Sequence, residues 1–262
     1  MNRGDAPARA LVTGAARGLG LAVAEALLGA GSARVGLADR DDRELATVVD
    51  RLAARHGAER VIGCPGDVTD QGSVATMTEQ AVAFAGGMDA LVTCAGVISR
   101  GRSADHDWSL WQRDLEVNVG GTYRCARAAF PALRESADAS VVTVGSLGSF
   151  LGMPQRPSYN TSKAAVLGLT RTLAFEAGPA GIRVNSLSPG PCRGARMTRN
   201  FTAEAAASGT SYAAAEEAFV SRAALHRLVE EDEVALAVLA MLRMPGLCGA
   251  DIDLSAGMIA PA

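Results

Sequence analysis

Lysine and aromatic residues are scarce in this chain of 262 residues. Lys163 is the one lysine, so 24 of the 25 basic residues are arginine, and aromatic residues make up 4% of the total. The net charge is −3, and no cluster of basic residues is interleaved with aromatic ones. A nucleic-acid partner requires concentrated positive charge opposite its phosphates, so we expect no such partner.

Long apolar runs are also missing. No run approaches the roughly 18–20 residues that a membrane-spanning helix needs. The N-terminal residues include Arg3, Asp5 and Arg9 and contain no signal-peptide core. We therefore expect a cytoplasmic protein without a membrane partner, in which residues 1–7 are flexible.

Cysteine and histidine give no sign of a disulfide framework or a metal site. The cysteines are odd in number and show no CxxC spacing, which is typical of reduced thiols. The histidines lie far apart, so we expect them at the surface and expect no bound metal. The residues concerned are Cys64, Cys94, Cys125, Cys192 and Cys248, and His56, His106 and His226.

Short apolar runs alternate with helical patterns along the chain. Runs that lack a polar–apolar alternation are typical of strands buried on both faces, and repeated βα units imply right-handed crossovers. The sequence therefore predicts an α/β fold in which one domain, residues 1–262, holds a doubly wound parallel sheet. The expected strands cover 9–14, 33–39, 60–67, 88–96, 139–146, 182–190 and 250–255.

Two of the connections between the expected strands are longer than the others. A single long helix is expected over about 107–135. Residues 191–227, rich in Ala, Thr, Ser and Arg, break the strand–helix rhythm. Long excursions of this kind in compact α/β domains are often lids over a site, so we expect a helical lid there. A strand follows it, which argues against a domain boundary.

A glycine-rich stretch, "TGAARGLG" at 13–20, joins the first strand to the first helix. Gly14, Gly18 and Gly20 permit a tight turn and a close approach of backbone to phosphate, with Arg17 and Leu19 between them. The helix N-terminus that follows presents free N–H groups to a diphosphate. The context of strand, loop and helix predicts a dinucleotide site.

An acidic residue follows at the end of the second strand. Asp39 lies 19 residues after Gly20, where its carboxylate is expected to accept hydrogen bonds from the adenosine ribose and to repel a 2′-phosphate. Arg17 and Arg40 favour the opposite choice, because both can pair with a 2′-phosphate. We give Asp39 the greater weight and expect NAD, with NADP as the alternative. A helix-capping role for Asp39 is the competing interpretation.

Further cofactor contacts are expected after the third and fourth strands. Asp67, next to Val68, is placed to bind the adenine amino group, although an acid at a helix N-terminus is a close competitor. The fourth strand ends in Cys94, Ala95 and Gly96. A glycine there lets the backbone approach a cofactor, and a plain turn is the alternative.

Tyr159 and Lys163 have the spacing i, i+4, which places them on one face of a helix. Ser146 ends the fifth strand, at the sheet edge where such folds bind ligands, and Asn118 lies in the long helix. A tyrosine phenolate can take the hydroxyl proton of a secondary alcohol while a hydride leaves. An ammonium about 4 Å away stabilises the phenolate by about 4 kcal/mol at an effective dielectric constant near 20.

The other two residues complete the predicted chemistry. Ser146 is expected to orient the substrate oxygen, and Asn118, by binding a water or a backbone group, to complete a proton path to Lys163. A compact ammonium suits this place better than the wide fork of an arginine, which accounts for the single lysine. The alternative, a half-buried tyrosine beside a solvated lysine, loses weight once all four residues and the glycine loop are taken together.

With these motifs in order, the sequence resembles the short-chain dehydrogenase/reductase family, in its single-domain branch of about 250 residues. The resemblance implies a Rossmann fold with seven parallel strands, a tetrad of Asn118, Ser146, Tyr159 and Lys163, and a homotetramer or homodimer built on two long helices. It also implies that the backbone of Pro189 and Gly190 contacts the nicotinamide side. It rests on "TGAARGLG", "DV" at 67–68, "CAG" at 94–96, Asn118, Ser146, "YNTSK" at 159–163 and "SPG" at 188–190.

Three places depart from the family pattern, one of them the C-terminal turn, where "SAGM" at 255–258 replaces a "DGG"-like sequence. Cys94 stands where the family usually has asparagine, and Gly194 where a threonine commonly contacts the carboxamide, so Thr198 or the backbone is the expected substitute. The resemblance places the substrate near Val97, Ile98, Leu147, Gly148, Gln155 and Pro191. Two interpretations are open for Arg193, Arg196 and Arg199. They either bind an anionic substrate or form a solvated surface, and we favour the solvated surface.

Three functions remain in competition. An NAD-linked alcohol dehydrogenase or ketoreductase acting on a small hydroxy or keto compound is favoured. An NADP-linked reductase, such as one acting on acyl-carrier thioesters, is kept open by Arg17. A non-catalytic protein that senses the cofactor is disfavoured because all four tetrad residues are present.

Overall fold

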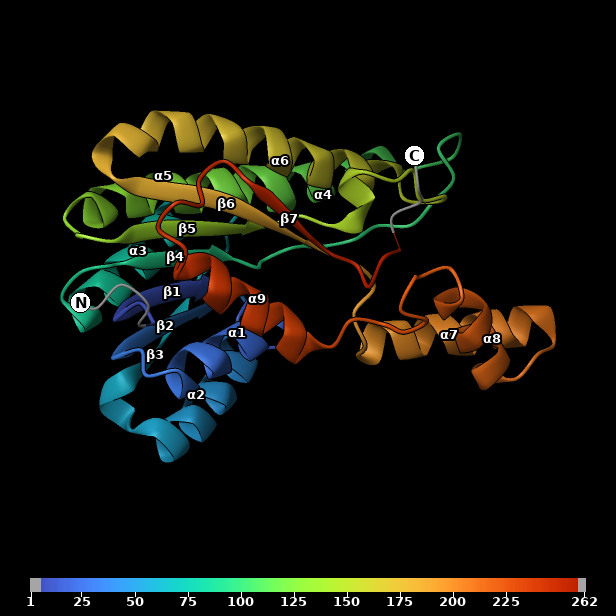
Figure 1. Cartoon of the computed structure of the whole chain (residues 1–262), viewed down its shortest axis with the longest axis horizontal. Coiled ribbons are helices and arrows are strands. Elements are labelled where there is room, and N and C mark those ends of the chain that lie inside the picture. Colours follow the sequence, from blue (N-terminus) through green and yellow to red (C-terminus); the bar gives the residue numbers. More distant parts are fainter. Residues whose placement is uncertain (1–5, 259–262) are drawn as a thin grey trace.

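Seven parallel strands form one sheet at the centre of the computed structural model, which describes residues 6–258 (Figure 1). Across the sheet the strands follow the order 3-2-1-4-5-6-7, so the chain runs outward from the first strand in one direction and then returns to fill the other side. The predicted doubly wound α/β fold is confirmed. The strands are β1 (Arg9–Thr13), β2 (Arg34–Asp39), β3 (Val61–Pro65), β4 (Ala90–Thr93), β5 (Ala139–Val144), β6 (Ile182–Pro189) and β7 (Asp251–Leu254).

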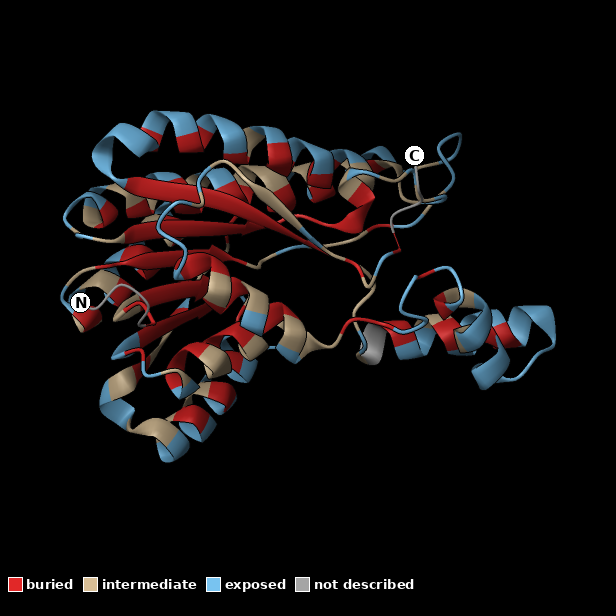
Figure 2. Ribbon diagram, in the orientation of Figure 1, coloured by how far each residue is buried: buried red, intermediate tan, exposed pale blue. Residues whose placement is uncertain are grey.

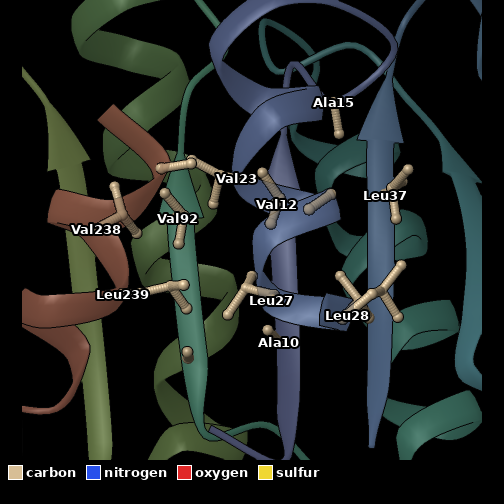
Figure 3. Packing of buried hydrophobic residues seen from close by; sticks show 14 of the residues in the cluster. Ala10, Val12, Ala15, Val23, Leu27, Leu28, Leu37, Val92, Val238 and Leu239 are labelled. Carbon is tan, nitrogen blue, oxygen red and sulfur yellow. The ribbon is translucent and has the colours of Figure 1, made fainter. Parts of the chain in front are cut away.

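Helices cover both faces of this sheet. One face packs against α1 (Gly18–Gly29), α2 (Asp42–His56) and α9 (Glu231–Leu242), and the other against α3 (Gln71–Ala85), α5 (Gly121–Arg134) and α6 (Pro157–Ala177). Because successive strand residues point to opposite faces, Val12 joins the first cluster and Leu11 the second. Figure 3 shows Val12 among side chains of β4, α1 and α9. Burial on both faces explains the unbroken apolar runs (Figure 2).

The single helix expected over 107–135 is interrupted. It consists of α4 (Trp108–Leu115), a π-helical turn at Glu116–Gly120, and α5. A π-turn adds a residue to the helical path and commonly occurs at functional sites. The apolar pattern on either side of it is unchanged, so the sequence did not reveal it.

Helix α9 was also absent from the predicted elements. It begins with a capping box in which the side chains of Glu230 and Glu233 each accept a backbone N–H of the other residue. That pair, placed before an apolar run, is a recognisable signal for a helix start.

Residues 191–227 are largely helical, as expected, and form α7 (Ala195–Ser208) and α8 (Tyr212–Val220). Figure 1 shows both helices extending away from the sheet, and Figure 2 shows them mostly exposed. They enclose a small apolar cluster of Met197, Phe201, Val220 and Leu228. At the base of this excursion Val229 donates its N–H to the Pro191 carbonyl at 3.1 Å, which ties its two ends together.

Within residues 6–258, no helix is long and apolar enough to cross a membrane. Of the N-terminal residues expected to be flexible, 1–5 lie outside the described part of the chain. Ala6 is buried.

Candidate active site

The glycine loop between β1 and α1 leaves no room for side chains at two of its glycines. Gly14 has φ of +66°, and a Cβ there would lie 2.8 Å from the Ala95 backbone. A Cβ on Gly20 would lie 2.2 Å from the carbonyl oxygen of Gly14. The loop is therefore packed backbone to backbone against the end of β4.

The N-terminus of α1 lacks the usual side-chain cap. Arg17 occupies the N-cap position without a capping hydrogen bond, and the first turn contains no acidic residue. In contrast α2 and α3 begin with Asp41 and Asp70, whose side chains accept a backbone N–H. The uncapped N–H groups of α1, facing a glycine loop, fit the diphosphate of a dinucleotide.

Asp39 is held at the mouth of this loop by two backbone groups. Its Oδ2 accepts the N–H of Ala16 and its Oδ1 that of Asp41, both at 3.1 Å. The Arg17 guanidinium pairs with the Asp41 carboxylate on the surface. The pKa of Asp41 lies below its usual value because its carboxylate accepts the Glu44 N–H and also binds Arg17. Arg40 is exposed.

The residues expected around the adenine have local roles as well. The Asp67 carboxylate accepts the N–H and hydroxyl of Thr69, both at 2.8 Å, and the backbone bond lowers its pKa. It does not cap a helix, since Asp70 caps α3. Val68 is buried against the backbone of Gly121. Cys94 is partly exposed as a residue, but desolvation of its thiol raises the pKa to about 12.

Helix α6 carries Tyr159 and Lys163 to the carboxyl end of β5. Lys163 is buried, and its Nζ donates to the Val144 carbonyl at 2.8 Å and lies 6.0 Å from the centre of the Tyr159 ring. Ser146 is also buried, and its Oγ accepts the N–H of Gly148 at 3.1 Å. The Ser146 hydroxyl acts as an acceptor in this bond, so its own hydrogen can be donated to another group.

Asn118, in the π-turn, is fixed by the protein itself. Its Oδ1 accepts the N–H of Val97 at 2.8 Å, and its Nδ2 donates to the Val97 carbonyl and to the Ser162 hydroxyl. The backbone of Val97 is therefore a partner of the kind predicted for Asn118. A Cβ on Gly96 would lie 3.2 Å from Asn118 Oδ1 and 3.6 Å from Lys163 Nζ, so Gly96 separates the two side chains.

A cavity of about 360 Å³ opens at this end of the sheet. It is lined by the tetrad members Ser146, Tyr159 and Lys163. Three residues expected near the substrate or the nicotinamide do not line this cavity: Gly148, Gln155 and Thr198. Gln155 is exposed, and the Thr198 hydroxyl donates to the Gly194 carbonyl. Predicted residues that do line it are Leu19, Cys94, Gly96, Val97, Ile98, Leu147, Pro189, Gly190, Pro191 and Arg199.

Comparison with known proteins agrees with this geometry. The family described as enoyl-(acyl carrier protein) reductase matches residues 14–258. Trans-4-hydroxycyclohexanecarboxylate dehydrogenase of Sinomonas cyclohexanicum is 35% identical over 185 residues, which are 69% of this chain and 71% of that protein. The chain belongs to the short-chain dehydrogenase/reductase family.

Two further similarities support the assignment. The 3-alpha-(or 20-beta)-hydroxysteroid dehydrogenase of Mycobacterium bovis is 36% identical over 69% of this short-chain dehydrogenase/reductase and 67% of its own length. The crystal structure of L-sorbose reductase from Gluconobacter frateurii, in complex with NADPH and L-sorbose, superimposes with a TM-score of 0.92 at 25% identity and covers 100% of both chains.

Three arginines near the start of the excursion in this short-chain dehydrogenase/reductase, Arg193, Arg196 and Arg199, have different environments. Arg193 is bound by Glu230 and Glu216, which raise its pKa and anchor α8 to the start of α9. The side chain of Arg196 lies outside the described part of the structure. Arg199 is exposed and also lines the cavity.

Several residues that line the cavity were not predicted from the sequence. These residues lie on segments that come together at the cavity only in the folded protein. Their spacing in the sequence matches no motif. They are Arg100, Met153, Arg156, Met197, Asn200 and Phe219.

Asp114, also missed, joins the loop after β4 to the start of α6. It is fully buried and accepts the N–H and hydroxyl of Ser99 at 2.9 and 2.6 Å and the hydroxyl of Ser158 at 2.7 Å. The Nε2 of His106 lies 2.9 Å from the Ser158 hydroxyl. His106 is half-buried, which corrects the expectation of a surface histidine. The network ends one residue before Tyr159 and therefore helps to position it.

Proposed function

We propose that this protein transfers a hydride between NAD(H) and a secondary alcohol or ketone. The observation that carries the proposal is that the Tyr159 phenol, the Ser146 hydroxyl and the Lys163 ammonium open on one cavity, whose wall also includes Leu19 of the glycine loop. The relatives named above are a hydroxyacid dehydrogenase, a hydroxysteroid dehydrogenase and a ketose reductase.

The chemistry divides among a few groups. A nicotinamide cofactor, when bound, accepts the hydride of the alcohol or supplies it to the ketone. Tyr159 exchanges a proton with the substrate oxygen, and Ser146 donates its hydroxyl hydrogen to that same oxygen and orients it. Lys163, desolvated and held by the Val144 carbonyl, stabilises the phenolate by its charge.

Asn118 has a positioning role in this scheme. Its amide holds both backbone groups of Val97, and it also fixes Ser162, the residue before Lys163. It thereby sets the spacing between the loop after β4 and the catalytic helix. The excursion of α7 and α8 supplies part of the cavity wall, and we propose that it acts as a lid.

We propose NAD as the preferred cofactor, with NADP as the alternative. The Asp39 carboxylate is fixed beside the glycine loop by two backbone N–H groups, and a fixed carboxylate repels a ribose 2′-phosphate. The Arg17 guanidinium, which could offset that repulsion, is paired with Asp41. The NADPH in L-sorbose reductase and the exposed Arg40 favour the alternative.

Fluorescence titration with NADH and, separately, NADPH tests the proposal without any substrate. We expect NADH to bind at least about tenfold more tightly. Asp39→Asn should narrow this difference, whereas Asp42→Asn, an equal charge change on an exposed neighbour, should leave it unchanged. Tighter binding of NADPH to the unmodified protein would overturn the NAD preference, and failure of both to bind would overturn the dehydrogenase proposal.

We also propose a homotetramer or homodimer in the cytoplasm. Trp108 and Trp111 stack on α4 with Trp108 largely exposed, and Phe175 on α6 is exposed as well. These apolar groups lie on the long helices through which the family is expected to assemble. None of the five cysteines, which all lie among the described residues, forms a disulfide, as in a reducing compartment. Light scattering of the purified protein measures the assembly directly.

A further inference from the structure

The wall of the cavity is positively charged and has no acidic member within the described residues. Arg100, Arg156 and Arg199 line it together with Lys163, and no aspartate or glutamate does. The chain has more acidic than basic residues overall, 28 against 25. A cavity with four cations and no carboxylate is therefore a local departure from the average composition.

Three separate segments bring these arginines together. Arg100 lies on the loop after β4, Arg156 immediately precedes α6, and Arg199 lies on α7. The guanidinium of Arg100 donates to the Asn200 side chain at 2.8 Å, which links the loop to α7 next to Arg199. The arrangement thus depends on the tertiary fold.

Arg100 and Arg199 differ from the arginines that form ion pairs elsewhere in the protein. Arg193 and Arg227 each bind a glutamate, and Arg183 binds Asp138. No ion pair to a carboxylate is formed by Arg100 or Arg199 within the described residues. Their charge is available to a ligand that enters the cavity.

Much of the remaining wall is apolar. Val97, Ile98, Leu147, Met153 and Phe219 supply hydrocarbon surface, and the volume of about 360 Å³ suits a small molecule. A ligand that satisfies both parts has an apolar skeleton and an anionic group at one end.

We propose, resting on the function proposed above, that the substrate is a hydroxy- or ketoacid whose carboxylate binds Arg100, Arg156 and Arg199 while its hydroxyl or carbonyl group meets Tyr159. Guanidinium groups recognise carboxylates through paired, charge-assisted hydrogen bonds. The cofactor phosphates are the other possible anions. The arginines share their cavity with Tyr159 and Ser146, whereas Arg17 and Arg40 lie at the nucleotide end.

Calorimetric titration with two unreactive ligands, cyclohexanecarboxylate and cyclohexanecarboxamide, tests the proposal. The two ligands share one apolar skeleton and differ in charge, so the difference between their affinities reports the contribution of the negative charge to binding. Both are added to the protein saturated with NADH, and neither contains a reducible ketone. We expect the carboxylate to bind about tenfold or more tightly than the amide. In the double variant Arg100→Gln/Arg199→Gln, carboxylate affinity should fall by about tenfold and amide affinity should stay unchanged.

Arg102→Gln is the matched control, because Arg102 is exposed on the same loop and does not line the cavity. It removes one positive charge outside the cavity and should change neither affinity. Both substituted arginines of the double variant are exposed, so a folded protein is expected, and an unchanged circular dichroism spectrum verifies it.

Equal affinity for carboxylate and amide, absence of carboxylate binding, or an unchanged carboxylate affinity in the double variant would each overturn the inference. A loss of NADH affinity in that variant would assign the arginines to the cofactor and overturn it as well. If the carboxylate binds through the arginines but neither NADH nor NADPH binds, the anion subsite stands and the dehydrogenase proposal fails.

Discussion

Replacement of Asp114 by alanine is predicted to destabilise the protein strongly. The carboxylate is fully buried and accepts three hydrogen bonds, two from Ser99 and one from Ser158, at 2.6–2.9 Å. The Arg113 guanidinium lies 3.6 Å away. Alanine would remove the acceptor of all three hydrogen bonds.

The expected loss of stability depends on whether each hydrogen-bond donor can find another acceptor after the substitution. The Ser99 N–H is fixed in the backbone and would stay unpaired, at a cost of about 1–3 kcal/mol. The two hydroxyls can rotate, and they lose charge-assisted bonds that are about twice as strong as neutral ones. Together these terms give about 3–5 kcal/mol, the range observed when one partner of a buried charged network is removed. That is a large part of the 5–15 kcal/mol typical of a whole domain.

Urea denaturation measures this change as a shift of the midpoint at constant slope. Asp107→Ala is the matched control, because Asp107 is the exposed N-cap of the same helix, α4, and its loss should cost only about 1 kcal/mol. If the Asp114 variant loses no more stability than this control, the reasoning about the buried network is refuted.

Three other substitutions give independent tests. Gly20→Ala places a Cβ 2.2 Å from a backbone oxygen and should lower both NADH affinity and the urea midpoint, whereas Gly29→Ala meets no atom within 4 Å and should change neither adversely. Lys163→Met should lower kcat by at least about a hundredfold without loss of fold, as judged by circular dichroism. Burial tends to raise the pKa of Asp89, but its hydrogen bonds with Arg9 and Ser136 outweigh this and hold the pKa below its usual value. The stability that Asp89 contributes is therefore complete above about pH 4 and is lost as the pH falls through the folded-state pKa. Unfolding measured from pH 7 downward should show a weaker acid dependence for Asp89→Asn, and an identical dependence would contradict the pKa assignment.

Much of the fold could be predicted from the sequence because it is determined by the character of short, local segments. Strands such as β5 are buried on both faces: every residue from Ala139 to Val144 is buried, Ser140 and Thr143 included, and the lack of a polar–apolar alternation predicts a parallel sheet. The glycine loop was equally clear, since Gly14 and Gly20 stand where only a hydrogen fits. Ser146 follows the carboxyl end of a strand, and it lines the cavity together with Tyr159 and Lys163.

The features that escaped prediction depend on contacts between distant segments. Arg100 and Arg199 are far apart in sequence and line one cavity only because the fold brings the loop after β4 to α7, where Arg100 bonds Asn200. Asp114 resembles any helix acid until Ser99 and Ser158 are seen to donate to it. The π-turn leaves no trace in the apolar pattern. Helix α9 is different, because its capping box could have revealed it.

Substitution of Tyr159 by phenylalanine tests the central claim most directly. The probe is the secondary alcohol that the unmodified protein oxidises best among cyclic hydroxyacids, polyols and hydroxysteroids. With it, Tyr159→Phe should reduce kcat by at least about 10²–10⁴-fold, with the NADH dissociation constant unchanged. Tyr123→Phe, at an exposed tyrosine, should leave turnover intact. Turnover of the Tyr159 variant within tenfold of the unmodified protein would contradict the assignment of this phenol as the proton-transferring group.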